Sequence, residues 1–264
     1  MVLPDKQRYA VEDLVSIMEL LRSGQGCPWD REQTHQSIRK NFIEETYEAV
    51  EAIDTNDSAL LKEELGDVLL QVVFHAQIEK EKGRFSFGDV CDDICKKLIS
   101  RHPHIFADAK AGTAEQVLGN WEAIKKEEKR QNTHTESLQS VPRSLPALMR
   151  AQKVQSRAAK VGFDYPGAEE AMKDLRSEVE EIEEALAINS RRAIQEELGD
   201  LLFSVVNVSR FAGVDAEEAL TWSCNKFIDR FALLERLAAE RGINIQKANI
   251  HVLNSLWKEV KNKE

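Results

Sequence analysis

The sequence EELGD occurs twice in this chain, at Glu63–Asp67 and again at Glu196–Asp200. Each copy runs into apolar sequence, which places both within predicted helices. Around the second copy, apolar residues leave the helix almost no polar face: Leu198, Leu201, Leu202, Val205, Val206 and Val208. We therefore expect Asp200 to lie beside the core, where an unpaired carboxylate would be costly. Each copy of the motif should have a partner elsewhere in the chain.

Acidic sequence upstream of each copy supplies that partner, at Glu44–Glu48 and at Glu180–Glu184. Residues three apart share one face of a helix, so two carboxylates with this spacing point the same way. Two such helices packed together would gather four carboxylates in each half of the chain. The predicted sets are Glu45 with Glu48 and Glu64 with Asp67 in the first half, then Glu181 with Glu184 and Glu197 with Asp200 in the second.

Four carboxylates in one place repel one another unless a cation lies between them. A hard divalent cation with oxygen ligands is the usual remedy. The simplest choice is Mg²⁺, which keeps some waters and takes further ligands from substrate phosphates. The competing interpretation is a solvated glutamate-rich surface. It is favoured for the acidic residues outside the four pairs, namely Glu44, Glu63, Glu180, Glu183 and Glu196.

The duplication extends beyond the acidic residues and indicates one domain used twice. Lys97 and Arg101 follow Cys95 with the same spacing by which Lys226 and Arg230 follow Cys224. Trp121 in the first half matches Trp257 in the second. The separation between matched residues changes only slightly along the chain, which is typical of helices of constant length joined by variable loops.

The composition predicts an all-α protein, because 264 residues contain only 12 Gly and 6 Pro and no segment alternates like a strand. The predicted helices span 7–22, 35–54, 57–82, 87–101, 114–131, 144–161, 167–188, 190–212, 215–241 and 249–262. The polar stretch near 131–146 contains two prolines and predicts a linker. We therefore expect domains at 1–132 and 147–264, separated by a linker at 133–146.

Charge and cysteine content limit the classes of function. A net charge of −10 argues against a nucleic-acid polymer as ligand, although a small phosphorylated ligand carrying its own Mg²⁺ remains compatible. The four cysteines have no CxxC spacing and imply neither a disulfide framework nor a zinc site. With no signal-peptide pattern and no apolar run of membrane-spanning length, we expect a soluble, cytoplasmic protein with no membrane partner.

The repeated pattern EExxE, spacer, ExxD resembles the MazG nucleoside triphosphate pyrophosphohydrolases. The resemblance covers nearly the whole chain and includes the segments Gly26–Asp30, Arg101–His104 and Pro142–Leu148. It implies two tandem MazG-like helical bundles of the dimeric dUTPase type, a homodimer, and Mg²⁺ with Mn²⁺ as a substitute. The implied reaction cleaves nucleoside triphosphates of broad base specificity to the monophosphate and pyrophosphate. This reaction would clean the nucleotide pool or lower a signalling nucleotide.

The resemblance also implies roles for individual residues and assigns the activity chiefly to the C-terminal half. Glu181, Glu184, Glu197 and Asp200 match the catalytic metal ligands, one of which is expected to accept a proton from water. Lys226, Arg230 and Trp257 match positions that contact the nucleotide. A second site in the N-terminal half would use Glu45, Glu48, Glu64, Asp67, Lys97, Arg101 and Trp121.

The chain departs from the family pattern at two phosphate-contact positions, and its two halves differ from each other in helix spacing. Family members can carry lysines four residues before the Glu181 and Glu197 positions, where this chain has Ser177 and Ala193. The neighbouring arginines, Arg176 and Arg192, either replace that charge or are solvated. Sixteen positions separate Glu48 from Glu64 but thirteen separate Glu184 from Glu197, which predicts a longer turn in the first half.

Other interpretations of these residues stay open on sequence alone. Lys226 and Arg230, four apart on one helix face, either meet phosphate or form a solvated basic edge. Trp257 either stacks on a base or lies in the core. The alternative functions are a narrow-specificity all-α pyrophosphohydrolase acting on dUTP or a phosphoribosyl nucleotide, and a nucleotide-sensing scaffold without turnover. Pyrophosphate release from a panel of triphosphates distinguishes all three.

Overall fold

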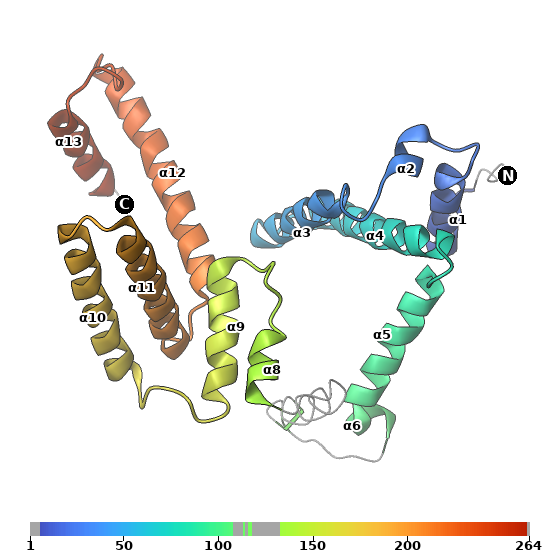
Figure 1. Cartoon of the computed structure of the whole chain (residues 1–264). Helices are drawn as coiled ribbons and strands as arrows, with labels where there is room; N and C mark the ends of the chain where they lie inside the picture. Colours follow the sequence, from blue (N-terminus) through green and yellow to red (C-terminus); the bar gives the residue numbers. More distant parts are fainter. Residues whose placement is uncertain (1–5, 108–112, 114–115, 118–132, 263–264) are drawn as a thin grey trace. The chain divides into compact units, whose positions relative to one another are not determined.

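The computed structural model describes residues 6–107, 113, 116–117 and 133–262, and across these residues it contains helices and no strand (Figure 1). The predicted all-α fold is therefore confirmed. The chain divides into two compact units, Met1–Lys129 and Arg130–Glu264. No described helix combines the length and the apolar composition that crossing a bilayer requires.

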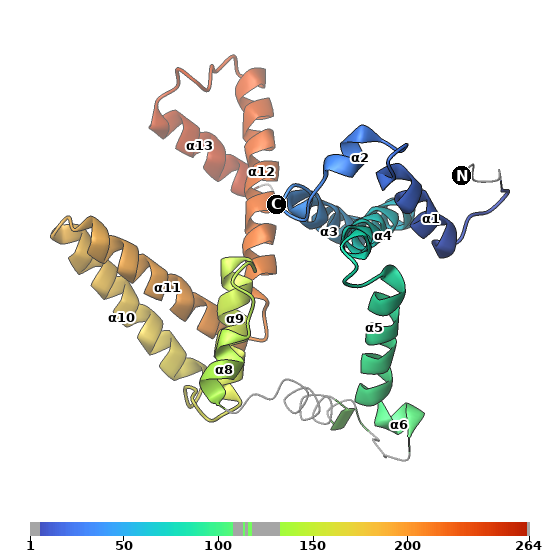
Figure 2. The same ribbon diagram turned by 45° about the vertical axis from the view of Figure 1, so that its right-hand side comes forward.

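The N-terminal unit is built on an antiparallel pair of long helices, α3 and α4, which lie side by side in Figures 1 and 2. Helix α1 packs against α4, and α5 continues from the end of α4. The described helices of this unit are α1 (Val11–Arg22), α2 (Pro28–Glu32), α3 (Arg39–Asp54), α4 (Ser58–Glu81), α5 (Phe87–Arg101) and α6 (Pro103–Phe106).

The C-terminal unit repeats this arrangement with the antiparallel pair α10 and α11 (Figure 2). Helix α9 packs against α11, α8 packs against α9, and α12 pairs with α13. The described helices here are α8 (His134–Gln139), α9 (Ala147–Ala159), α10 (Ala168–Ala187), α11 (Arg191–Phe211), α12 (Ala216–Glu240) and α13 (Ile250–Lys261).

Within each hairpin a turn joins the two long helices, and the two turns have the same length and conformation. Each turn contains three residues, 55–57 in the first hairpin and 188–190 in the second. Asn56 and Asn189 take positive φ angles of 53° and 51°, a conformation that asparagine tolerates better than most residues. The side chains of Asp57 and Ser190 then cap the next helix. The prediction of a longer first turn is therefore wrong.

Buried residues of the first hairpin have buried counterparts in the second, at the same separation in sequence as the two EELGD copies. Ala52 and Ala185 are both buried, as are Val73 and Val206, and so are Ala49 and Ile182. Because buried positions coincide on both helices, the two hairpins are in register at this spacing. The structural counterpart of Glu45 is therefore Glu178. The sequence prediction pairs Glu45 with Glu181 instead, about one helical turn later.

Most differences from the predicted helices occur in short segments. Helix α1 begins at residue 11 instead of 7, and α3 begins at 39 instead of 35. Helices α2, α6 and α8 are too short to produce a periodic pattern, so the sequence did not predict them. Nearly all of the predicted helix 114–131 lies outside the described residues.

The segment expected to be a linker is partly ordered against the C-terminal unit. Helix α8 begins with a capping box at Thr133, and Val141 behind it is buried. Arg157 of α9 donates a hydrogen bond of 2.7 Å to the hydroxyl of Ser140. These contacts hold α8 on α9.

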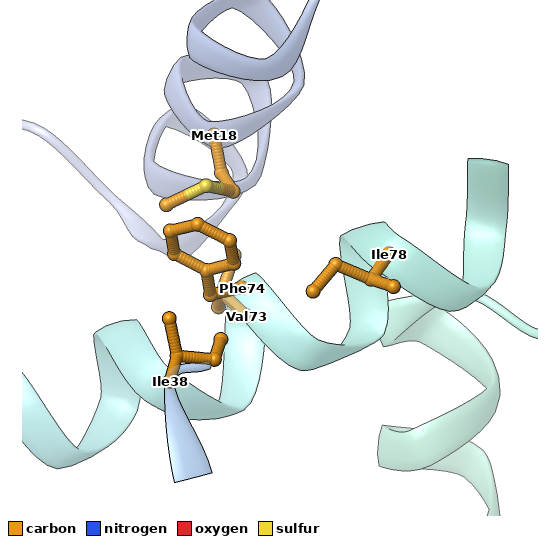
Figure 3. Close-up of a cluster of buried hydrophobic side chains, with 5 residues drawn as sticks. All are labelled: Met18, Ile38, Val73, Phe74 and Ile78. Atoms are coloured by element: carbon orange, nitrogen blue, oxygen red, sulfur yellow. The ribbon is translucent and has the colours of Figure 1, made fainter. Parts of the chain in front are cut away.

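A hydrophobic cluster fills the space between α1, the start of α3 and α4 in the N-terminal unit. Figure 3 shows Phe74 extending from α4 toward Met18 of α1, with Ile38 below. The buried members of the cluster are Met18, Ile38, Val73, Phe74 and Ile78. In the C-terminal unit a separate cluster joins α12 and α13 through Leu234, Ala238, Leu256 and Val260.

Candidate functional site

The N-terminal hairpin gathers carboxylates from α3 and α4. Oxygens of Glu45, Glu48 and Glu64 lie within 4.8 Å of one another, and Glu64 is buried. Burial is the main cause of the raised pKa of Glu64, followed by the charges of Glu48 and Asp67. The pKa of Glu45 is raised by burial and then by Asp67. All four predicted N-terminal carboxylates are therefore close enough to interact.

The C-terminal hairpin makes the equivalent cluster from α10 and α11. Oxygens of Glu178, Glu197 and Asp200 lie within 4.8 Å of one another. The pKa of Glu197 is raised by burial first and then by the charges of Glu181 and Asp200. Burial and Glu181 likewise raise the pKa of Glu178, with further contributions from Asp174, Asp200 and Glu197. The carboxylates of Glu178, Glu181, Glu197 and Asp200 thus act on one another.

One member of this cluster differs from the sequence prediction, which named Glu184 and omitted Glu178. Glu184 is exposed and stands further along α10 than Glu178, the residue that the structure places beside Glu197 and Asp200. The acidic residues of α10 have the ExxE spacing both at 178–181 and at 181–184. The spacing within this helix therefore does not distinguish the two pairs. The spacing of the two EELGD copies, applied to Glu45, would have identified Glu178.

The surroundings of Asp200 also differ from the expectation. Asp200 is exposed, and the apolar neighbours Leu198 and Leu202 are 45% and 52% exposed. The apolar face of α11 that was expected to be core is therefore partly open in a single chain. Asp200 lies at its edge and not beside a closed core.

The residues in this cluster suit a hard divalent cation. Their donor atoms are all carboxylate oxygens, the ligand type that Mg²⁺ prefers. One oxygen of Glu178, Oε2, is buried without a hydrogen-bond partner. Burial first, and then repulsion from neighbouring carboxylates, raise the pKa of Glu178 and of Glu197, and a bound cation would relieve the repulsion.

At the two positions where family members can carry lysine, the described contacts show no positive charge beside the cluster. The hydroxyl of Ser177 donates to Oε1 of Glu181 at 3.2 Å. Arg176 and Arg192 are both exposed, and no described ion pair joins either to a carboxylate of the cluster. Whether they contact phosphate stays a prediction.

The predicted nucleotide contacts lie on α12 and α13. Lys226 Nζ is 4.0 Å from the ring centroid of Trp222, and the ring of Phe227 packs 5.2 Å from that of Trp257. Trp257 is half-buried against the α12–α13 cluster, so it contributes to packing and keeps a partly exposed face. Arg230 is half-buried one turn after Lys226. Among the described contacts, none joins Lys226 or Trp257 to the carboxylates.

The predicted N-terminal counterparts are only partly described. Lys97 is exposed and Arg101 half-buried, both on α5. Trp121 lies outside the described residues. Of the predicted N-terminal site residues that the structure describes, it brings together the four carboxylates of α3 and α4.

A cavity of about 560 Å³ adjoins the C-terminal carboxylates and was not predicted. Glu178 and Asp200 belong to its wall, together with residues of α9, α11 and the loop that follows α9. The polar residues that line it include Gln155 and Asn207. Asn207 interrupts the apolar sequence of α11, and this was the available signal that the position is not ordinary core.

Comparison with known proteins identifies the family. The model of the MazG nucleotide pyrophosphohydrolase domain matches residues 33–106 and again 167–232. The chain is 44% identical over 257 residues to the nucleoside triphosphate pyrophosphohydrolase of Escherichia coli K12, an alignment that covers 96% of this chain and 98% of that protein. The chain belongs to the MazG nucleotide pyrophosphohydrolase family.

Other MazG relatives align over similar lengths. The Thermotoga maritima protein named nucleoside triphosphate pyrophosphohydrolase/pyrophosphatase MazG is 45% identical over 250 residues, 95% of each chain. A Mycobacterium tuberculosis nucleoside triphosphate pyrophosphohydrolase is 34% identical over 247 residues, 92% of this chain and 64% of that protein. The predicted family, the tandem all-α fold and the predicted class of enzyme are confirmed.

Both MazG matches enclose a carboxylate hairpin. The first covers α3 to α6, and the second begins at α10 and ends within α12. Pyrophosphohydrolases of this family are generally metal-dependent, and each matched region contains an acidic cluster able to hold a metal ion. The family assignment and the geometry therefore point to the same two places in the chain.

Proposed function

We propose that this protein hydrolyses nucleoside triphosphates and their deoxy forms to the monophosphate and pyrophosphate, with Mg²⁺ held by the C-terminal carboxylate cluster. The observation that carries the proposal is the convergence of Glu178, Glu181, Glu197 and Asp200 from two helices of a MazG domain. The names of the relatives supply the substrate class and the bond cleaved.

Each of the two helices would supply two of the four metal ligands. Glu178 and Glu181 would hold the metal from α10, and Glu197 and Asp200 from α11. Mg²⁺ bound there would supply positive charge beside the phosphate oxygens of the substrate. Mn²⁺, with similar oxygen preferences, is expected to substitute.

A water molecule must attack phosphorus while the bond to pyrophosphate breaks, and its proton must go to a base. A carboxylate oxygen of the cluster would accept this proton, because the four carboxylates are the acceptors that lie beside the metal site. The products are the nucleoside monophosphate and pyrophosphate.

Residues of α12 and α13 would contact the rest of the nucleotide. Lys226 and Arg230 present positive charge on one face of α12, which suits phosphate oxygens. Trp257 offers a partly exposed ring for stacking.

We further propose that residues 147–264 form the main catalytic domain and that residues 1–132 form a domain of secondary activity. The N-terminal domain retains all four carboxylates, so a second site is part of the proposal. A cytoplasmic location is supported by the free state of all four cysteines, which fits a reducing compartment. A homodimer is supported by the large apolar side chains exposed on α11.

The test is pyrophosphate release from a panel of ribo- and deoxyribonucleoside triphosphates in the presence of Mg²⁺. Release from most members, abolished by EDTA, is the expected result. A response to one triphosphate would favour a narrow-specificity pyrophosphohydrolase. Nucleotide binding without release would favour a sensing protein and contradict the proposal.

A further inference from the structure

Another cavity lies in the N-terminal unit, between α1, the second half of α4 and the start of α5. Its volume of about 510 Å³ falls within the range of small-molecule sites, roughly 300–1,000 Å³. None of the four carboxylates of the N-terminal cluster belongs to its wall, to which α4 contributes from Val73 onward. The cavity is therefore separate from the candidate metal site of the same unit.

Much of the wall is apolar. Val11 and Val15 come from α1, Val73 from α4 and Phe87 from α5. Val73 is 1% exposed and also belongs to the hydrophobic cluster of Figure 3, so this side of the cavity is continuous with the core. Apolar side chains from three helices suit the apolar body of a small molecule.

A buried amide in the wall has an oxygen without a partner. Gln77 is 6% exposed, and its Nε2 donates to Oε1 of Glu81 at 3.2 Å. This bond sets the orientation of the amide, and no described contact reaches Oε1 of Gln77. A buried acceptor without a partner is unfavourable, so a ligand that donates an N–H would stabilise it.

The charged side chains of the wall favour a positively charged ligand. Lys80 already pairs with Glu19, at 2.9 Å between Nζ and Oε2, whereas none of the described ion pairs involves Glu12. The hydroxyl of Ser86 likewise already donates to Asp89, at 2.7 Å. The wall thus offers an unpaired carboxylate and an unpaired amide oxygen, which are the acceptors that an ammonium group requires.

The equivalent helices of the C-terminal unit are joined directly. Gly88, two residues after the N-cap of α5, corresponds to Glu217 of α12. Oε2 of Glu217 accepts from the backbone N–H of Met149 in α9 at 3.3 Å, and α9 packs against α12. By the same correspondence Cys91 replaces Leu220. Among the described contacts, no hydrogen bond joins α1 to the start of α5, and the cavity lies at this place.

We propose that the cavity between α1, α4 and α5 binds an apolar primary amine in its ammonium form. Glu12 and Oε1 of Gln77 accept hydrogen bonds from the ammonium group. The apolar body of the ligand packs against Val15 and Val73. The site is independent of the proposed hydrolysis, because its wall contains no residue of either carboxylate cluster.

The two cysteines of α5 allow a test on the unaltered protein. Cys91 is half-buried in the cavity wall, and Cys95, one turn later, is exposed outside it. Saturating phenethylamine or hexylamine should slow the alkylation of Cys91 by iodoacetamide severalfold and leave that of Cys95 unchanged. Tandem mass spectrometry, which distinguishes the two sites, measures both rates. The matched compounds without an ammonium group, 2-phenylethanol and 3-phenylpropanoate, should protect Cys91 far less. No protection by either amine, or equal protection by a matched compound, would overturn the proposal.

Two substitutions separate the charge of the site from its space. Glu12→Gln keeps the shape of the side chain and should weaken the binding of phenethylamine about tenfold, as expected for one hydrogen bond to a charged group. Cys91→Leu installs the residue of the C-terminal copy and should abolish binding by filling the cavity. Cys95→Leu is the matched change outside the cavity and should bind like the wild type. Calorimetric titration measures these affinities, and wild-type affinity in Glu12→Gln or in Cys91→Leu would overturn the proposal.

The outcome is distinguishable from that of the proposed hydrolysis. Glu197→Gln removes a proposed metal ligand and should bind phenethylamine with the affinity of the wild type. Loss of amine binding in this variant would contradict a separate site. If Cys91→Leu does not fold, the alkylation rates of the unaltered protein still decide whether an amine occupies the cavity.

Discussion

The Nδ1 atoms of His35 and His75 lie 2.7 Å apart, with the two rings stacked at 5.0 Å between centroids. Only one proton fits between these atoms. His35 Nε2 lies 2.6 Å from Oε1 of Glu79, which also pairs with Lys82 and Arg84. The segment that precedes α3 is thereby tied to α4 by a contact that depends on protonation.

The first prediction is that acidification destabilises the N-terminal unit through His75. Burial, and then the neighbouring His35, lower the pKa of His75 below 6.5 in the folded chain, so the unfolded chain binds protons first. This stabilisation is present above pH 6.5 and is lost as the pH falls through the lowered pKa. Thermal unfolding between pH 7 and pH 5 should show the loss, and His75→Phe should flatten it. A parallel pH profile in the variant would contradict the assignment.

The second prediction distinguishes Glu178 from Glu184, two glutamates on one helix. Glu178→Gln should lower pyrophosphate release by more than about a hundredfold, beyond the loss of an outer-shell partner. Glu184→Gln should stay near the wild type, because its side chain is exposed outside the cluster. The rates of the two purified variants decide the matter, and the reverse order would restore the register predicted from sequence.

The third prediction concerns the two halves. Glu197→Gln or Asp200→Asn should remove most pyrophosphate release, whereas Glu64→Gln or Asp67→Asn should leave a substantial fraction. An amide keeps the shape of the side chain but not the charge that a Mg²⁺ ligand needs. Circular dichroism should show all four variants folded. Loss of activity in the N-terminal pair alone would move the main site to the other hairpin.

The fourth prediction is that Mg²⁺ raises the melting temperature in the absence of nucleotide. The cation binds the folded clusters and not the unfolded chain, which at a hundred times its Kd contributes about 2.7 kcal/mol. Differential scanning calorimetry with increasing MgCl₂ measures the shift, and matched NaCl controls for ionic strength. The double variant Glu64→Gln with Glu197→Gln should lose most of it. A shift that survives in this variant would place the cation elsewhere.

The fifth prediction is self-association. Leu65 and Leu198, at equivalent positions of the two hairpins, are 54% and 45% exposed. A single chain therefore leaves apolar surface uncovered on both hairpins. Light scattering at micromolar concentration should give twice the chain mass of 30.0 kDa. A glutamate in place of Leu198 should shift the distribution toward the monomer. A wild-type mass of one chain would exclude the dimer.

Much of the fold follows from local sequence, because the long helices carry strong periodicity and the EELGD copies align the two hairpins. The short helices α2, α6 and α8 depend on capping and tertiary contacts, for example the bond from Arg157 to Ser140. Helical periodicity cannot predict elements of this length.

The predicted C-terminal carboxylates differ from the cluster in the structure at one position, Glu184 in place of Glu178, and the difference has a physical origin. Two acidic pairs on α10 occupy the same helix face, so spacing gave two equivalent registers. The burial of Ile182 and Ala185, which matches that of Ala49 and Ala52 in the first hairpin, distinguishes the two registers. The C-terminal cavity depends on packing between helices, which periodicity does not describe, and Asn207 in the apolar sequence of α11 was its one signal in the sequence.

Asn207 lines a cavity at the position that Phe74 fills with a buried ring in the N-terminal hairpin. The C-terminal hairpin therefore lacks the dispersion contacts that this ring provides in the other copy. We expect this half to open first on heating, and proteases to cut it before the other half.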